Sequence, residues 1–367
     1  MGKACARECA SIAVWSPDLD KMTPPSPRPP LPPIAEGAAL AARTQSLETY
    51  AALDLGTNNC RLLVARGAPR GFRVIDAFSR IVRLGEGLAA TGVLSDAAMA
   101  RTIEALRVCA GKVAERRVTR ARYVATEACR RARNCSEFIA RVRADTGIAI
   151  EIISTGEEAR LVVAGCAPLL DRHVPHAFVF DIGGGSTELV WLRVPRDPRA
   201  PARVEGFMSL PHGVVTLADR YGGREVSAET YAAMVAEMRE AILPFEARHR
   251  VGAHIARGDV QMLGSSGTVT TLAGIHLQLP RYNRSLVDGS VLSFEHVQRI
   301  SARLAAMGYE ERVAHPCIGG ERADMVLAGC AILEAICLTW PIGRLRVADR
   351  GIREGILFGL LDGRTGP

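Results

Sequence analysis

The chain has 367 residues, of which 48% are hydrophobic and 5% aromatic, and its formal net charge is +7 at pH 7. This length allows two domains that each bury a core, and the apolar segments are too short to cross a membrane as helices, so no membrane association is expected. The ten cysteines form no CxxC pair, which disfavours zinc and disulfide frameworks and predicts reduced thiols in a cytoplasmic protein.

Residues 1–48 differ in composition from the rest of the chain. The run from Pro24 to Pro33 is dominated by proline and suits neither a helix nor a sheet, so a disordered extension is expected here. The opening residues lack the apolar region and cleavage site of a secretion signal. The folded part is expected to comprise an N-terminal domain, residues 49–172, and a C-terminal domain, residues 173–367.

The predicted elements alternate in both halves. In the first, strands are predicted at 50–53, 60–65, 72–83, 123–126 and 148–154, and helices at 96–117, 128–144 and 157–170. In the second, strands flank residue 181 and occur at 203–210, 260–263 and 345–347, with helices at 213–220, 228–249, 269–276, 294–307, 323–337 and 352–361. This order predicts an α/β fold with a mixed sheet in each half, and the last helix is expected to pack back on the first domain.

Two hairpins carry the same chemical pattern. The segments 51–64 and 180–190 each read as an apolar strand that ends in an aspartate, a turn with glycine and hydroxyl or amide residues, and a second apolar strand. Glycines let backbone N–H groups approach an anion, and Asp54 and Asp181 are placed to meet a metal ion or its waters. An ordinary β-hairpin explains either turn alone, but two copies predict a duplicated fold whose loops face a shared cleft.

A third glycine loop differs from the first two because it leads from a strand into a helix. Its residues Gly264, Ser265, Ser266, Gly267 and Thr268 are expected to present N–H groups to a phosphate or a nucleotide at the helix N-terminus. The chain has no GxxxxGK[ST] motif, and a strand instead of a helix follows the GGGST run, which argues against a P-loop or a Rossmann turn.

Two adjacent glutamates, Glu157 and Glu158, lie in the first turn of the helix predicted at 157–170. One interpretation is structural, because Thr155 and Glu158 have the spacing of a capping box. The other is catalytic: hydrolysis of a phosphoanhydride needs a base for the attacking water, and no histidine or cysteine nucleophile is evident beside a phosphate loop. The sequence pattern alone leaves both open.

A cluster of arginines between Arg116 and Arg143 concentrates the positive charge. It is either a solvated surface or a basic groove for a long polyanion, which would gain affinity by releasing counterions. Nucleic acid would satisfy the same electrostatics, but no aromatic residues interleave with the arginines to stack on bases, so no nucleic acid is expected.

Histidines do not suggest a metal centre. His173 and His176 flank Pro175 in a predicted loop, and no cysteine or carboxylate lies near them at the spacing of metal ligands. We therefore expect neither histidine to bind a metal ion.

Several motifs occur in the order and spacing of one known family. They are LDLGTNN with Arg61, ATEACRRARN, EIISTGEEARL, FDIGGGSTELV, SLPHGVVTL, LGSSGTVTTLAG, ERADMVLAG and VADRGIREGIL. Over residues 49–363 the chain resembles the exopolyphosphatase and guanosine pentaphosphate phosphatase family. The resemblance implies two ribonuclease-H-like domains, as in actin and the sugar kinases, with an active site in the cleft between them. It also implies removal of terminal phosphates from inorganic polyphosphate or guanosine pentaphosphate with Mg2+ as cofactor.

The resemblance assigns roles to residues of this chain. Glu158 resembles the family's catalytic base, and Asp181 and Glu188 its acidic pair near the metal, with Asp54 a further contact through water. Arg61 and Arg130 resemble the arginines that neutralise phosphate charge. The two phosphate loops correspond to Gly56, Thr57 and Asn58, and to Gly183, Gly184, Gly185, Ser186 and Thr187.

One departure from the family concerns substrate choice. Asp288 and Gly289 stand where members often carry His-Gly, and an aspartate in contact with substrate would repel phosphate. We expect inorganic polyphosphate to be the substrate in preference to guanosine pentaphosphate. The alternative from another class is a non-catalytic binding protein that senses guanosine tetraphosphate or polyphosphate. The sequence does not decide between a monomer and a homodimer.

Overall fold

The computed structural model of the chain describes residues 48–69 and 71–363. The disordered extension expected for residues 1–48 lies outside these residues, apart from Glu48. The eight cysteines of the described part are free and buried. Within the same part, no helix combines the length and the hydropathy needed to cross a membrane.

The first sheet has the strand order β3-β2-β1-β4-β5. Its strands are β1 (Thr49–Leu55), β2 (Asn59–Ala68), β3 (Gly71–Ile81), β4 (Arg120–Ala125) and β5 (Glu151–Ile152). The helices of this half are α2 (Leu88–Thr91), α3 (Asp96–Glu115), α4 (Glu127–Arg131), α5 (Cys135–Thr146) and α6 (Thr155–Cys166), followed by the short 3-10 helix η1 (Ala167–Leu169). The boundary that we predict between residues 172 and 173 falls between η1 and the next strand, and it stays a prediction.

The second sheet has the order β10-β11-β9-β6-β7-β8. Its strands are β6 (His176–Ile182), β7 (Thr187–Arg193), β8 (Arg203–Leu210), β9 (Val260–Ser266), β10 (Val291–Ser293) and β11 (Arg344–Ala348). The helices are α7 (Val214–Tyr221), α8 (Ala228–His249), α9 (Val251–Ile255), α10 (Gly267–His276), α11 (Arg284–Val287), α12 (Phe294–Ala306), α13 (Tyr309–Ala314), α14 (Val326–Thr339) and α15 (Ile352–Leu361).

The two sheets are copies of one plan. In each, the first three strands of the half pair antiparallel as a meander, the fourth pairs parallel to the first, and the fifth pairs parallel to the fourth, with β10 as an addition to the second sheet. Both copies also carry a register shift in the second strand, after Val64 and after Trp191, ten residues beyond Asp54 and Asp181 respectively. The predicted α/β class with a duplicated mixed sheet is therefore confirmed.

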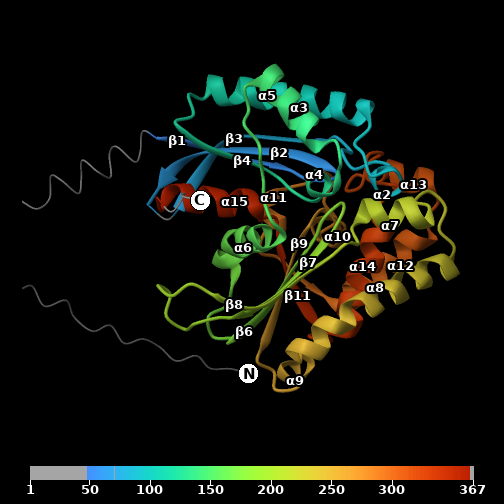
Figure 1. The fold of residues 1–367 in the computed structure, drawn as a ribbon. Coiled ribbons are helices and arrows are strands. Elements are labelled where there is room, and N and C mark those ends of the chain that lie inside the picture. Colours follow the sequence, from blue (N-terminus) through green and yellow to red (C-terminus); the bar gives the residue numbers. More distant parts are fainter. Residues whose placement is uncertain (1–47, 70, 364–367) are drawn as a thin grey trace, which may run out of the picture. The chain divides into compact units, whose positions relative to one another are not determined.

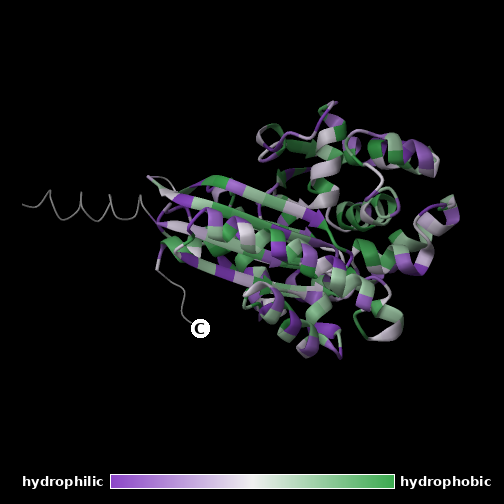
Figure 2. Cartoon of the chain, turned by 90° about the horizontal axis from the view of Figure 1, so that it is seen from above, coloured by the Kyte–Doolittle hydropathy of each residue, from purple (hydrophilic) through white to green (hydrophobic). Residues whose placement is uncertain are grey.

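Successive side chains of each strand point to opposite faces of its sheet, and the apolar ones form three hydrophobic cores. Ala51 and Leu53 of β1 pack with α3 and α5 on the outer face of the first sheet, and Phe178 and Phe180 of β6 pack with α8, α10 and α14 on the outer face of the second. The intervening residues of both sheets, such as Ala52, share a central core with α6 and α15. Figure 1 shows these layers, and Figure 2 shows hydrophobic and hydrophilic residues alternating along the strands.

Two glycines allow α6 and α15 to lie in backbone contact within the central layer. A Cβ atom on Gly165 would overlap the carbonyl group of Gly351, and one on Gly355 would overlap that of Leu161. The C-terminal helix thus contacts both β1 and α6. This packing fixes the position of α6, whose first turn carries Glu158.

One predicted helix is wrong. The pattern at 128–144 suggested a single helix, but the chain forms α4 and α5 with a break at Ala132, whose backbone is extended. The break arises because the Asn134 side chain pairs with the backbone of Leu94, accepting a hydrogen bond at 2.8 Å and donating one at 3.0 Å. This tertiary contact between segments distant in sequence overrides the local helical periodicity. The predicted elements also omit the short α2, α9, β10, α11 and α13.

We expect Gly165→Ala and Gly355→Ala each to lower the free energy of unfolding by about 1–3 kcal/mol, because the new methyl group forces the two helices apart. Denaturant unfolding monitored by circular dichroism measures this loss. Gly111→Ala is the matched control: Gly111 lies in α3 with open space around its Cβ position. Its replacement should be neutral or add up to about 1 kcal/mol. Equal effects at all three positions would contradict the packing argument.

Candidate active site

The alternation of β1 and β6 aims both aspartates into the space between the sheets. Asp54 follows Ala52 on the face that joins the central core, and Asp181 follows Val179 on the corresponding face of the second sheet. Each aspartate lies near the C-terminal end of its strand, where the flanking core gives way to a loop. The duplicated fold therefore brings two carboxylates from distant parts of the chain toward one cleft.

Each aspartate has a cross-strand partner seven residues later. In the first hairpin Asp54 pairs with Arg61, and in the second Asp181 pairs with Glu188. Glu188 is 1% exposed and accepts a hydrogen bond of 2.9 Å from the hydroxyl group of Ser209. The first hairpin thus contributes one charge of each sign, whereas the second contributes two negative charges.

The two glycine loops have the same turn and lie against each other. The N–H group of Gly56 donates to the carbonyl of Asn59, and that of Gly183 donates to the carbonyl of Ser186, both at 2.9 Å. A Cβ atom on Gly184 would lie 3.1 Å from the backbone nitrogen of Asn58. The glycines at 183–185 have no positive φ among the described backbone angles. They are required for close approach of the loops instead of for an unusual backbone conformation.

A cavity of about 120 Å³ lies between these loops. Its wall includes, from the sites predicted in the sequence, Asp54, Gly56, Thr57, Asn58, Arg61, Glu158, Asp181, Gly183, Gly184, Gly185, Ser186, Ser266, Gly267 and Thr268. Four oxygen atoms of the first hairpin are buried without a hydrogen-bond partner in the described structure, on Asp54, Thr57, Asn58 and Asn59. A run of unsatisfied oxygens on one cavity wall is suited to a ligand that supplies cations, N–H or O–H groups.

Glu158 enters the cavity from the first turn of α6. Ser154 caps this helix, its hydroxyl accepting a hydrogen bond from the N–H group of Glu157 at 3.2 Å. The structural interpretation, a capping box between Thr155 and Glu158, is therefore wrong, because the N-cap is Ser154. The Glu158 carboxylate is consequently free of a capping role, and it is 6% exposed.

Arg130 holds the Glu158 side chain in place. Its guanidinium donates to Glu158 Oε2 at 2.8 Å, to Glu127 Oε2 at 2.8 Å and to the carbonyl of Ile153 at 3.0 Å. Arg130 does not line the cavity. A direct contact with phosphate, as the family resemblance implied, would require one of these ion pairs to open. The geometry makes Arg130 a positioning residue for Glu158.

The acidic side chains of the cleft raise one another's pKa values. Burial and the neighbouring Glu158 carboxylate raise the pKa of Asp181 to about 7. Burial is also the main cause of the raised pKa values of Glu158, Glu188 and Asp54, and it outweighs the opposing effect of Arg130 at Glu158. Four buried carboxyl groups of this kind are compensated by protons or by a cation.

These groups fit a magnesium ion by their chemistry. Mg2+ prefers oxygen ligands, usually one or two carboxylates together with water and substrate phosphates. Asp54 offers an unpartnered buried oxygen, and Asp181 and Glu188 stand opposite each other on adjacent strands. The residues that would hold Mg2+ are therefore these three, with Glu158 beside them.

Some predicted site residues point elsewhere, and the strand alternation explains why. The Thr187 hydroxyl donates to the carbonyl of His212 at 2.6 Å on the outer face of its sheet. Gly264 lies against the ring of Phe180, which leaves no room for a Cβ atom. Neither residue lines a described cavity, and Glu188 is also absent from both linings, although its cross-strand partner Asp181 lines both. Ser265 lines the second cavity described next.

A second cavity of about 580 Å³ adjoins the first and shares Asp54, Arg61 and Asp181 with it. Five arginines contribute to its wall: Arg61, Arg284, Arg322, Arg350 and Arg353. Sequence reasoning missed four of these. A signal was present for Arg350 and Arg353, because they follow β11, and the carboxyl ends of parallel strands meet at the same sheet edge.

The arginines between Arg116 and Arg143 line neither cavity. Arg116 pairs with Asp76 at 2.8 Å, and Arg122 pairs with Glu151 at 3.0 Å and with Glu157 at 2.9 Å. Of the two interpretations of this cluster, the basic groove is therefore not supported by either cavity, and the solvated surface is favoured.

Asp288 does not face the substrate space with an unpaired charge. Its carboxylate accepts hydrogen bonds from the backbone N–H of Asp349 at 3.1 Å and from the guanidinium of Arg350 at 2.7 Å. The expected repulsion of phosphate is thus offset by Arg350, and Asp288 fixes the loop that follows β11.

Comparison with known proteins agrees with this geometry. The family model for the Ppx/GppA phosphatase family matches residues 63–363. The chain belongs to the Ppx/GppA phosphatase family. The family expected from the sequence motifs is thereby confirmed, as is the fold of two α/β halves around a cleft.

Solved structures of this family are similar along nearly their whole length. The Aquifex aeolicus family member is 26% identical with a TM-score of 0.70, covering 87% of this chain and 99% of that one. An exopolyphosphatase-like protein is 28% identical with a TM-score of 0.76, covering 85% and 97%. An exopolyphosphatase from Cytophaga hutchinsonii is 24% identical with a TM-score of 0.76, covering 86% and 98%, and this likeness concerns the fold alone.

In chelator at pH 8, we expect Asp181→Asn to melt several degrees above the unsubstituted protein. A carboxyl group whose folded pKa is raised to about 7 destabilises the folded state increasingly as the pH rises from about 4 through 7. At pH 5 the difference should therefore shrink. Added Mg2+ should raise the melting temperature of the unsubstituted protein at pH 8 and have little effect on the variant. Differential scanning calorimetry measures both, and identical Mg2+ responses would contradict this site.

Proposed function

We propose that this protein is an exopolyphosphatase that removes the terminal phosphate of inorganic polyphosphate with Mg2+. The observation that carries the proposal is the continuity of the two cavities. The first combines a glutamate held by Arg130, two glycine loops and an acidic cluster. The second is lined by five arginines, of which Arg284 and Arg350 also pair with acidic neighbours. A small reaction site joined to a larger basic space suits a substrate with many identical charged units.

The proposed reaction is a displacement at the terminal phosphorus. A water molecule attacks this phosphorus and transfers a proton to Glu158, and the bridging P–O bond breaks to release phosphate and a shortened chain. Arg130 keeps the Glu158 carboxylate directed into the cavity through the ion pair at 2.8 Å. Loop N–H groups at Gly184 and Gly185 and the Arg61 guanidinium are the groups for the phosphate oxygens. When bound, Mg2+ neutralises charge on the phosphate oxygens.

Guanosine pentaphosphate is the second candidate substrate, and one observation favours it. The rings of Phe78 and Tyr282 line the second cavity along with its arginines. Aromatic faces stack on nucleobases. The two substrates are distinguished by measuring phosphate release from long polyphosphate and from guanosine pentaphosphate side by side with Mg2+, and binding of either without turnover would favour the sensor class.

We expect Glu158→Gln to lower kcat by about 10²- to 10⁴-fold with little change in KM, because the amide keeps the shape and loses the basicity. Glu157→Gln is the matched control, since Glu157 is the adjacent residue of the same turn and pairs with Arg122 outside the cavity. Steady-state phosphate release measures both. A Glu158→Gln variant with more than about half of the normal rate would exclude a general base at this position.

A second prediction concerns chain length. Arg350→Gln should raise KM for long polyphosphate several-fold and leave tripolyphosphate nearly unaffected, because Arg350 lines only the second cavity. Arg116→Gln removes the same charge from a residue outside both cavities and should change neither KM. Equal effects of Arg350→Gln on long and short substrates would remove the second cavity from the proposed binding path.

A further inference from the structure

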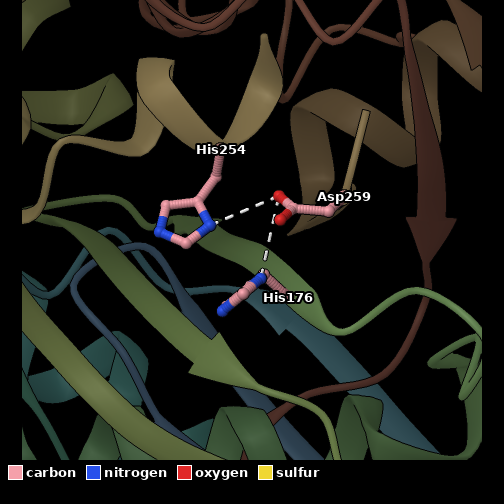
Figure 3. A group of neighbouring side chains, drawn as sticks. All are labelled: His176, His254 and Asp259. Carbon is pink, nitrogen blue, oxygen red and sulfur yellow. Dashed lines mark ion pairs between the residues drawn. The ribbon is translucent and has the colours of Figure 1, made fainter. Parts of the chain in front are cut away.

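Three side chains meet at the edge of the second sheet opposite the cleft. His176 begins β6, His254 lies in α9 and Asp259 directly precedes β9. Figure 3 shows the two imidazole rings and the carboxylate turned toward one another. In the parallel pair β6 and β9, this edge holds the strand starts, whereas Asp181 and Ser265 lie at the strand ends. The group is therefore separate from the candidate active site.

The spacing of the three side chains suits one metal ion. Asp259 Oδ1 lies 3.3 Å from His254 Nδ1 and 3.8 Å from His176 Nδ1. One ligand atom from each residue lies within 4.8 Å of the other two. A tetrahedral ion with bonds of about 2.0–2.1 Å places its ligand atoms about 3.3 Å apart. Small side-chain movements would therefore close the site around an ion.

Buried polar atoms in the group lack partners. His176 is 7% exposed, and neither its Nδ1 atom nor Asp259 Oδ1 has a hydrogen-bond partner in the described structure. The His176 ring stacks on Trp191 with an interplanar angle of 3°, which fixes its orientation. Burial and the nearby His254 lower the pKa of His176, favouring the neutral imidazole that binds metals.

Arg257 shows which atom of His254 is an acceptor. Its guanidinium lies 2.7 Å from His254 Nδ1 and 3.3 Å from Asp259 Oδ2. A guanidinium only donates, so Nδ1 of His254 accepts, and it faces a carboxylate oxygen that is also an acceptor. Two acceptors at 3.3 Å need a cation between or beside them. Arg257 is 55% exposed and supplies this charge from the solvent side.

We propose that His176, His254 and Asp259 bind a divalent transition metal of the zinc class, with the fourth position open to water. Imidazole and carboxylate ligands favour zinc over magnesium, so this site differs in selectivity from the acidic cleft. The ion would displace Arg257 and fasten α9 to the starting edge of β6 and β9. The expectation that His176 lacks metal-binding partners is revised, because these partners lie far along the chain and only the fold brings them near.

The test measures zinc uptake by the full chain. Protein freed of metal with chelator is dialysed against zinc in an excess of Mg2+, added to compete for the acidic cleft, and bound zinc is determined by elemental analysis. We expect about one equivalent for the unsubstituted protein, and at least about tenfold weaker binding for His254→Gln and Asp259→Asn. His173→Gln is the matched control, because this exposed histidine lies three residues before His176 and outside the group.

A further variant separates metal binding from misfolding. Arg257→Gln should bind zinc several-fold more tightly, since it removes the cation that competes for His254 Nδ1, and a loss of folding cannot produce tighter binding. The proposal is overturned if the unsubstituted protein binds no zinc up to about 100 µM, if the ligand variants bind as much as the control, or if Arg257→Gln binds no more tightly.

Discussion

Burying a carboxylate is costly unless a cation or hydrogen bonds compensate it, and this protein buries four of them between its two sheets. Such a cluster weakens the folded state, so the surrounding layers must supply the stability that the cleft gives up. The three hydrophobic cores meet this requirement, and the central one extends up to the strand ends from which Asp54 and Asp181 project.

The position of Glu158 illustrates how packing far from the cleft controls its chemistry. The glycine contacts of α6 with α15 set the helix within the central layer, Ser154 sets its first turn, and Arg130 orients the carboxylate. No single one of these contacts touches the proposed substrate. Together they fix the position of the Glu158 carboxylate, and therefore the place where it can accept a proton.

Much of the site could be predicted from the sequence, because successive side chains of a strand point to opposite faces of its sheet. Once β1 and β6 are recognised, the alternation of their side chains places Asp54 and Asp181 on the faces that join the central core. The same alternation places Thr187 and Gly264 on the outer face of their sheet, away from the cleft. The glycine-loop motifs hid this pattern. Motifs identify a loop, but alternation decides which of its residues face the ligand.

Other features depend on contacts that no local pattern encodes. The break between α4 and α5 results from Asn134 binding Leu94, and the arginines of the second cavity come from segments between Arg61 and Arg353. The ion pairs of Arg116 and Arg122 likewise needed the fold to place Asp76 and Glu151 beside them. Sequence composition located positive charge, and only the tertiary structure shows which of it is already neutralised.

The duplicated hairpins differ in their electrostatics. Equivalent positions of the two copies hold Arg61 and Glu188, each opposite the aspartate of its own hairpin. The second hairpin is therefore more acidic than the first, so the divergence of a single residue pair gives the two halves different charges. A ligand that carries both a cation and an anionic group meets this difference in charge, and its cation is favoured beside the acidic pair of the second hairpin.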